Sequence, residues 1–223
     1  MVVLFDLDDT LVDSQRAVGA AVLALHSTLN ISAPFEHFMR EWRRAHARHY
    51  PRYLQGSAPY SEVLRERVRD VVGKELSDRE AEEIFASYMT EYEKHWLLFD
   101  DVLPCLDKLN DRTLGVISNG PSVEQRRKLS RLGIEERFKT VLISEECGCP
   151  KPQAAIFLRA CASVGVSPSE AVYVGDQLEV DFLGARAAGL RAIWLNRSGS
   201  GERAGETDVV TSLRQVPTLI APG

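Results

Sequence analysis

The stretch that decides the fold spans residues 2–14 and reads VVLFDLDDTLVDS. Its first four residues, Val2 to Phe5, are apolar, which is typical of a strand covered on both faces in the middle of a parallel sheet. Three carboxylates, Asp6, Asp8 and Asp9, then follow within four residues. Each close pair of carboxylates costs about 4 kcal/mol at an effective dielectric constant of about 20. The pattern therefore favours a bound cation or a chemical use for these aspartates over an ordinary polar turn.

Composition places the 223-residue chain among ordinary globular proteins, with 44% hydrophobic and 26% charged residues. A net charge of -5 argues against nucleic acid or an anionic membrane as the main partner. No apolar run approaches the roughly 20 residues of a membrane helix, and the N-terminus does not read as a signal peptide. The four cysteines show no framework spacing, so we expect a reducing cytoplasm. His46 and His49 lie one helical turn apart, but without a third ligand we expect partly buried helix histidines.

Residues 15–97 show helical periodicity and no strand signal. We expect helices over residues 14–30, 35–53, 61–73 and 77–95, the last opened by the capping-box pattern S-x-x-E at Ser77 and Glu80. These helices should pack as a four-helix-bundle cap domain, residues 15–97, inserted after the first strand. Its second helix places Arg40, Arg44 and Arg48 on one face. That face could meet an anionic substrate, although a solvated or salt-bridged surface is the commoner arrangement.

From residue 98 onward, expected helices and strands alternate. We expect strands over residues 114–117, 140–143, 171–174 and 192–195, with an edge strand at 209–210. The expected helices cover residues 102–110, 122–132, 153–164, 178–188 and 213–220, and residues 198–206 form an exposed loop. Short loops between alternating elements indicate right-handed β-α-β units. The sequence therefore predicts an α/β core domain, residues 1–14 and 98–223, with a Rossmann-like parallel sheet and helices on both faces.

Seven polar side chains lie at or just beyond the ends of the expected strands: Asp6, Asp8, Ser118, Asn119, Lys151, Asp176 and Asp181. In open parallel sheets, ligands bind in the crevice beyond the carboxyl ends of the strands. Oxygen ligands without histidine or cysteine select a hard cation such as Mg²⁺. A hydroxyl, a lysine and backbone N–H groups can hold phosphoryl oxygens. The set therefore suits phosphoryl transfer.

On these residues the chain resembles hydrolases of the haloacid dehalogenase (HAD) superfamily that carry a helical cap after the first motif. The resemblance covers essentially the whole chain and rests on four motifs: D-x-D-x-T at residues 6–10, Ser118-Asn119, Lys151, and Gly175-Asp176 followed by Asp181. It implies a Mg²⁺-dependent phosphatase that acts on a small phosphorylated metabolite.

The resemblance also implies a role for each motif residue. Asp6 would attack phosphorus and form an aspartyl-phosphate, and Asp8 would serve as general acid and then general base. The phosphoryl group would be bound by Thr10, Ser118, Asn119 and Lys151. Mg²⁺ would be held by Asp6, the carbonyl oxygen of Asp8, Asp176 and Asp181, the last through water or by orienting Lys151.

Other functions stay open on the same residues. A phosphomutase uses the same core set. A 2-haloacid dehalogenase shares the aspartate nucleophile but needs neither a metal nor an acid at the second aspartate, so Asp8 and Asp176 argue against it. A phosphonatase would want a lysine in the first cap helix, and residues 14–30 contain none. A non-enzymatic phospho-receiver domain gathers similar groups but lacks a helical insertion after the first strand. The substrate, and whether the protein is a monomer or a homodimer, are not determined by the sequence.

Overall fold

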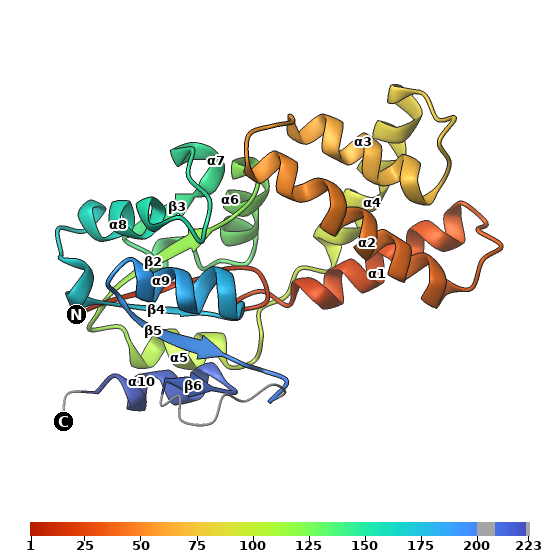
Figure 1. Ribbon diagram of the computed structural model, residues 1–223. Helices are drawn as coiled ribbons and strands as arrows, with labels where there is room; N and C mark the ends of the chain where they lie inside the picture. Colours follow the sequence, from red (N-terminus) through yellow and green to blue (C-terminus); the bar gives the residue numbers. More distant parts are fainter. Residues whose placement is uncertain (200–207, 222–223) are drawn as a thin grey trace. The chain divides into compact units, whose positions relative to one another are not determined.

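The structure, a computed structural model, describes residues 1–199 and 208–221 (Figure 1). The chain divides into two compact units. The core unit comprises Met1–Asp13 and Leu98–Gly223, and the helical unit comprises Ser14–Leu97. Most of the loop expected over residues 198–206 lies outside the described residues.

The core unit contains a six-stranded sheet in the order β3-β2-β1-β4-β5-β6. Every neighbouring pair of these strands is parallel. The strands are β1 (Val2–Phe5), β2 (Thr113–Ser118), β3 (Thr140–Ile143), β4 (Ala171–Gly175), β5 (Arg191–Leu195) and β6 (Val209–Val210). The predicted parallel sheet is confirmed, including the short edge strand.

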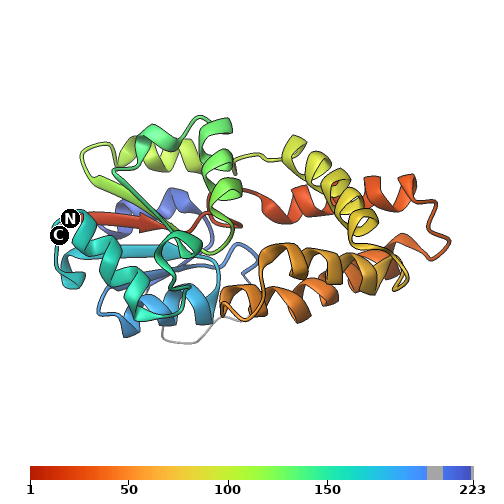
Figure 2. The ribbon, with the colours of Figure 1, turned by 90° about the horizontal axis from the view of Figure 1, so that it is seen from above.

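Alternate residues of β1 face two separate hydrophobic clusters, because successive side chains of a strand point to opposite faces. Val3 and Phe5 belong to one cluster, and Val2 and Leu4 to the other. Helices α5 (Val102–Lys108), α6 (Ser122–Arg131) and α10 (Val216–Leu219) cover the first face, and α8 (Ala154–Ser163) and α9 (Gly184–Ala187) cover the second (Figure 2). The predicted α/β fold with helices on both faces is confirmed.

Two segments of the core unit differ from the expected elements. A short helix, α7 (Ser144–Cys147), follows β3 directly, where no helix was expected because four residues are too few to show a period. The helix expected over residues 178–188 begins as a π-helical turn, η3 (Leu178–Leu183), before α9. The described part of the unit also contains three 3₁₀ turns: η1 (Glu135–Arg137), η2 (Pro168–Glu170) and η4 (Leu213–Gln215).

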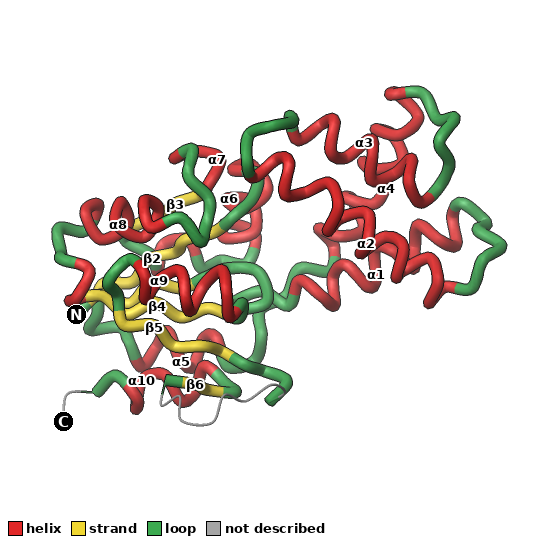
Figure 3. The backbone as a smooth tube through the Cα atoms, in the orientation of Figure 1, coloured by secondary structure: helices red, strands yellow, loops and turns green. Residues whose placement is uncertain are grey.

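The helical unit consists of α1 (Ser14–Thr28), α2 (Phe35–Leu54), α3 (Tyr60–Val71) and α4 (Asp78–Lys94), drawn without strands in Figure 3. Ser77 and Glu80 form the expected capping box at the start of α4. Aromatic side chains fill the interior, where the ring of the buried Trp42 lies 4.8 Å from that of Tyr88. The guanidinium of Arg67 lies over the Trp42 ring at 4.3 Å. Four helices were predicted here, and four are found.

The histidines singled out in the sequence contact neighbouring side chains of the fold, and the cysteines form no disulfide bonds. The buried His49 lies with its Nε2 2.9 Å from Asp70 Oδ2, and His46 stacks on Tyr50 at 4.5 Å. Burial, together with the nearby charge of Arg67, lowers the pKa of His46 to about 3. All four cysteines are free thiols. Within the described part of the chain, no helix is both long enough and apolar enough to cross a membrane.

Candidate active site

The sheet order reverses at β1, whose neighbours are β2 on one side and β4 on the other. Ligands of open α/β sheets bind at such a switch point, beyond the carboxyl ends of the strands. The register pairs Phe5 with Val116 of β2 and Val174 of β4, so these three strands end close together. The backbone N–H of Asp6 continues the ladder by donating to the carbonyl of Val174 at 2.9 Å. Asp6 is thereby fixed at the switch point.

Lys151 connects two of the predicted aspartates. Its Nζ donates to Asp6 Oδ1 at 2.5 Å and to Asp181 Oδ1 at 2.7 Å. A third donation reaches the hydroxyl of Tyr173 at 2.9 Å, and that hydroxyl in turn donates to Asp181 Oδ1 at 3.0 Å. Lys151 is only 5% exposed and Asp181 is fully buried. A lysine at this depth requires ionic partners, and the site provides them.

Three carboxylates meet here in a way that suits a cation. Asp6, Asp176 and Asp181 each place a carboxylate oxygen within 4.8 Å of the others. Burial, with the charges of Asp181 and Asp9, raises the pKa of Asp176 to about 7. Burial likewise raises the pKa of Asp6 well above its usual range, although Lys151 opposes the shift. Burial is the main cause of both shifts, and Lys151 acts against it. The all-oxygen donor set fits a hard divalent cation.

Asp181 is already engaged within the protein. Its Oδ1 accepts from Lys151 and Tyr173, and its Oδ2 accepts from the backbone N–H of Gln177 at 3.0 Å. Close packing of Gly175 against Asp181 makes this arrangement possible. A Cβ added to Gly175 would lie 2.5 Å from both Cβ and Cγ of Asp181. Of the two roles expected for Asp181, these contacts favour the orientation of Lys151.

The polar residues expected to bind phosphate lie at the same rim, and their side chains contact other site residues. Asn119 pairs with the backbone of Lys151, donating to its carbonyl at 3.0 Å and accepting from its N–H at 2.8 Å. The hydroxyl of the buried Thr10 donates to Asp176 Oδ1 at 3.5 Å. Ser118 ends β2, and its hydroxyl donates to the carbonyl of Asn119 at 3.4 Å. Phosphoryl binding by Thr10, Ser118 and Asn119 remains a prediction.

Asp8 has partners that the sequence did not indicate. Lys128 Nζ donates to its Oδ1 at 2.7 Å, and Gln125 Nε2 donates to its Oδ2 at 2.9 Å. Both partners come from α6 and are buried. One signal was present: Gln125, Lys128 and Leu129 are spaced as one face of a helix, so a lysine sits on an otherwise buried stripe. Tyr173 gave no comparable signal, because tyrosine is common in buried strands.

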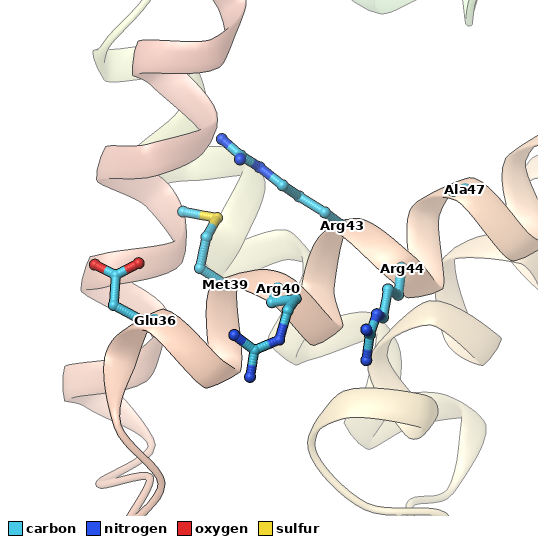
Figure 4. A pocket seen from close by; sticks show the side chains of 6 residues that line it. All are labelled: Glu36, Met39, Arg40, Arg43, Arg44 and Ala47. Atoms are coloured by element: carbon cyan, nitrogen blue, oxygen red, sulfur yellow. The ribbon is translucent and has the colours of Figure 1, made fainter.

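The arginines of α2 surround a pocket on that helix, lined by Glu36, Met39, Arg40, Arg43, Arg44 and Ala47 (Figure 4). Glu41 Oε1 lies 2.8 Å from a nitrogen of Arg44 and 4.0 Å from Arg40 Nε. Further along α2, Arg48 pairs with Asp70 at 2.7 Å. These contacts favour the salt-bridged surface over the substrate-facing alternative.

Known proteins are similar to most of the chain. A glyceraldehyde 3-phosphate phosphatase from Methanopyrus kandleri is 33% identical, over 87% of this chain and 83% of that protein. A 2-haloacid dehalogenase from Pseudomonas syringae pv. Tomato DC3000 is 30% identical, with a TM-score of 0.71 over 98% of this chain and 96% of the other. The HAD hydrolase YfnB from Bacillus subtilis, solved with bound magnesium, shares the fold at 23% identity, with a TM-score of 0.80 and coverages of 98% and 97%.

A family model of hydrolases, described as haloacid dehalogenase-like hydrolase, matches residues 1–189. The match includes all four motifs and the whole helical unit. This chain therefore belongs to the haloacid dehalogenase-like hydrolases and is an enzyme of that family.

Proposed function

We propose that the protein is a Mg²⁺-dependent phosphatase that hydrolyses a small phosphorylated metabolite through an aspartyl-phosphate on Asp6. The observation that carries the proposal is the convergence of Asp6 and Asp176 with the buried Lys151 at the switch point of the sheet. Such a cluster combines a nucleophile with a cationic group for phosphoryl oxygens. The phosphatase relative from Methanopyrus kandleri supports the same reaction class.

The aspartyl-phosphate on Asp6 divides the reaction into two steps, and Asp8 transfers a proton in each. In the first, an Asp6 carboxylate oxygen forms a bond to phosphorus while the bond from phosphorus to the leaving oxygen breaks, and Asp8 gives its proton to that oxygen. In the second, water attacks the aspartyl-phosphate, Asp8 takes a proton from the water, and phosphate leaves Asp6. Because Asp8 follows Asp6 by two residues and contacts α6, the two carboxyl groups have separate surroundings.

Charge neutralisation falls to Lys151 and the metal. Mg²⁺ would be held by Asp6, Asp176 and the carbonyl oxygen of Asp8, with Asp181 acting through water or through Lys151, and when bound it offsets the negative charge of carboxylates and phosphate. Lys151 lies against Asp6, and in this proposal it holds a phosphoryl oxygen next to the nucleophile. Asn119 holds the backbone of the Lys151 loop, and Ser118 adds a hydroxyl at the end of β2.

We also propose that the helical unit, residues 15–97, serves as a cap domain and selects the substrate. The phosphatase relative from Methanopyrus kandleri acts on glyceraldehyde 3-phosphate, a phosphorylated three-carbon sugar, so a metabolite of similar size is the first class to test here. A cytoplasmic location is consistent with the four free thiols.

The test is the hydrolysis of p-nitrophenyl phosphate by the full chain. We expect activity with Mg²⁺, its loss when EDTA removes the metal, and a loss of at least about 10³-fold for Asp6→Asn. Asp111→Asn, which changes an exposed carboxylate of the same unit, should retain full activity. Activity that survives EDTA or the Asp6 substitution contradicts the mechanism.

A second candidate is 2-haloacid dehalogenation, favoured by the 30% identity to the enzyme from Pseudomonas syringae. Asp8 and Asp176 argue for the phosphatase, because displacement of halide from carbon needs neither a proton donor for the leaving group nor a metal. Chloride release from 2-chloropropionate without added metal would identify the dehalogenase.

A phosphomutase would return an isomeric phosphate ester in place of inorganic phosphate, and phosphorus NMR of the products separates the phosphomutase from the phosphatase.

A further inference from the structure

Lys128 is the most deeply buried charged group in α6. It is fully buried, and its Nζ lies 2.7 Å from Asp8 Oδ1, 2.9 Å from Glu124 Oε1 and 3.3 Å from Gln125 Oε1. A lysine is almost never fully buried unless its charge is paired. These oxygen atoms belong to three different side chains, so the position of the ammonium group is determined from several directions.

Gln125 completes the contact with Asp8. It is 2% exposed, and its Nε2 donates to Asp8 Oδ2 at 2.9 Å and to the carbonyl of Asn119 at 3.2 Å. Its Oε1 accepts from Lys128. Since the amide oxygen faces an ammonium and the amide nitrogen faces two acceptors, the network assigns the orientation of this amide. Both carboxylate oxygens of Asp8 are therefore held by α6, more than 110 residues along the chain.

The two catalytic aspartates thus contact two different buried lysines. Asp6 lies against Lys151 on the α8 side of the sheet, and Asp8 lies against Lys128 on the α6 side. The Asp8 side chain keeps 29% of its surface exposed, whereas the Lys128 side chain keeps 1%. The Asp8 carboxyl group can therefore be reached from solvent, whereas Lys128 and Gln125, which hold its two oxygens, are buried.

We propose that Lys128 and Gln125 are positioning residues that set the orientation of the Asp8 carboxyl group for its proton transfers. The inference rests on the proposed phosphatase function and deepens it. Neither residue contacts the phosphorus or the metal in this scheme. They act on the reaction only through the direction in which Asp8 presents its oxygens.

The test compares two leaving groups. p-Nitrophenolate is a weak base and departs with little proton donation, whereas the alkoxide released from glycerol 2-phosphate needs a proton in the transition state. We expect Lys128→Met to lower kcat/KM for glycerol 2-phosphate by about 10²-fold and for p-nitrophenyl phosphate by less than about fivefold. A purely structural defect would lower both values by the same factor. Lys128→Arg, which keeps the positive charge, should recover part of the activity on the alkyl phosphate.

Two further variants keep the test decisive. Gln125→Leu should also lose more activity on glycerol 2-phosphate than on p-nitrophenyl phosphate, with a loss in kcat/KM of about tenfold on the first substrate. This variant replaces Lys128→Met in the test if Lys128→Met does not fold. In an Asp8→Asn background, Lys128→Met should cause no further loss on glycerol 2-phosphate, because residues that act through one group are not additive. Lys139→Met, which removes an exposed lysine of the same unit, is the matched control.

Equal losses on both substrates, or additive losses in the double variant, overturn the positioning role. They leave the proposed function intact as long as Asp6→Asn is inactive. Full activity of Asp6→Asn would instead overturn the phosphatase mechanism itself. A crystal structure of Lys128→Met gives a readout apart from activity, since Asp8 should adopt a different side-chain orientation there. An unchanged Asp8 orientation contradicts the proposal.

Discussion

The core unit and the helical unit hold their charged side chains in opposite ways. In the core unit, Lys151 and Lys128 are 5% and 0% exposed, and each lies between two carboxylates. In the helical unit, the side chains of Arg44 and Arg48 are 64% and 68% exposed and pair with acids at the surface. Its buried cation, Arg67, is 8% exposed and has no carboxylate within 4.0 Å in the described part of the chain.

We interpret the buried charges of the core unit as serving the proposed chemistry, and the exposed charges of the helical unit as hydrated surface groups. Ion pairs in the interior lose their hydration, and replacing them by apolar groups is often neutral or stabilising. The core unit nevertheless retains the Lys151 and Lys128 clusters, which both lie at the rim of the candidate site. In the helical unit, aromatic side chains pack around Trp42, and cation–π contact with two rings accommodates Arg67.

The largest expected effect comes from the glycine that packs against the Lys151 cluster. Gly175→Ala places a methyl group 2.5 Å from Asp181 Cβ and Cγ, so the buried carboxylate must move and release Lys151. We expect a loss of about 10³-fold in kcat/KM for p-nitrophenyl phosphate, because loss of a preorganised cationic group is costly in such a site. Gly19→Ala, in α1 of the helical unit, is the control: nothing lies within 4 Å of the added Cβ. Wild-type activity of Gly175→Ala contradicts the prediction.

The next effect tests the aromatic interior of the helical unit. Trp42 is fully buried, so Trp42→Ala should lower the free energy of unfolding by about 3–5 kcal/mol through lost burial and the cavity left behind. Arg67→Met should change it by less than about 1 kcal/mol, or raise it, because the charge has no carboxylate partner to leave unpaired. Urea unfolding measures both variants. A larger loss for Arg67→Met than for Trp42→Ala would mean that the cation, rather than packing, stabilises this unit.

The third effect concerns the carboxylates of the core unit and pH. Burial raises the pKa of Asp176 from 3.8 to about 7. At a pH between these two values, the Asp176 carboxyl group is therefore protonated in the metal-free folded protein and ionised in the unfolded chain. The resulting stabilisation is fully present below about pH 4 and is lost as the pH rises to about 7. Mg²⁺ requires the ionised carboxylate, so its affinity should rise by up to about tenfold per pH unit below pH 7 and then level off. Calorimetric titration with Mg²⁺ checks this, and a flat profile between about pH 5 and about pH 7 contradicts it.

The sequence predicts features that depend on local patterns, and it does not predict contacts between residues far apart in the chain. The strand β1, the parallel sheet and the four helices of the helical unit follow from periodicity, and the motif residues Asp6, Lys151 and Asp176 follow from where strands end. The spacing of Lys128 with Leu129 indicates a shared helix face, but its contact with Asp8 could not be predicted, because the two residues are far apart in sequence. The π-helical start of the segment after β4 also escaped prediction. The i→i+5 hydrogen bonds of a π-helix leave no recognisable pattern in a segment of 6 residues.

The smallest expected effect lies on the surface of α2. Arg44 pairs with Glu41 at 2.8 Å, but the two side chains are 64% and 34% exposed, so water and salt screen their attraction. We expect Arg44→Ala to change the free energy of unfolding by no more than about 0.5 kcal/mol, and less in 1 M salt. The same variant should hydrolyse p-nitrophenyl phosphate at the wild-type rate, since Arg44 already has an acidic partner within its own helix. A rise in KM with unchanged stability would show instead that this face meets the anionic substrate, and the division between chemical charges in the core unit and solvating charges in the helical unit would then fail at this residue.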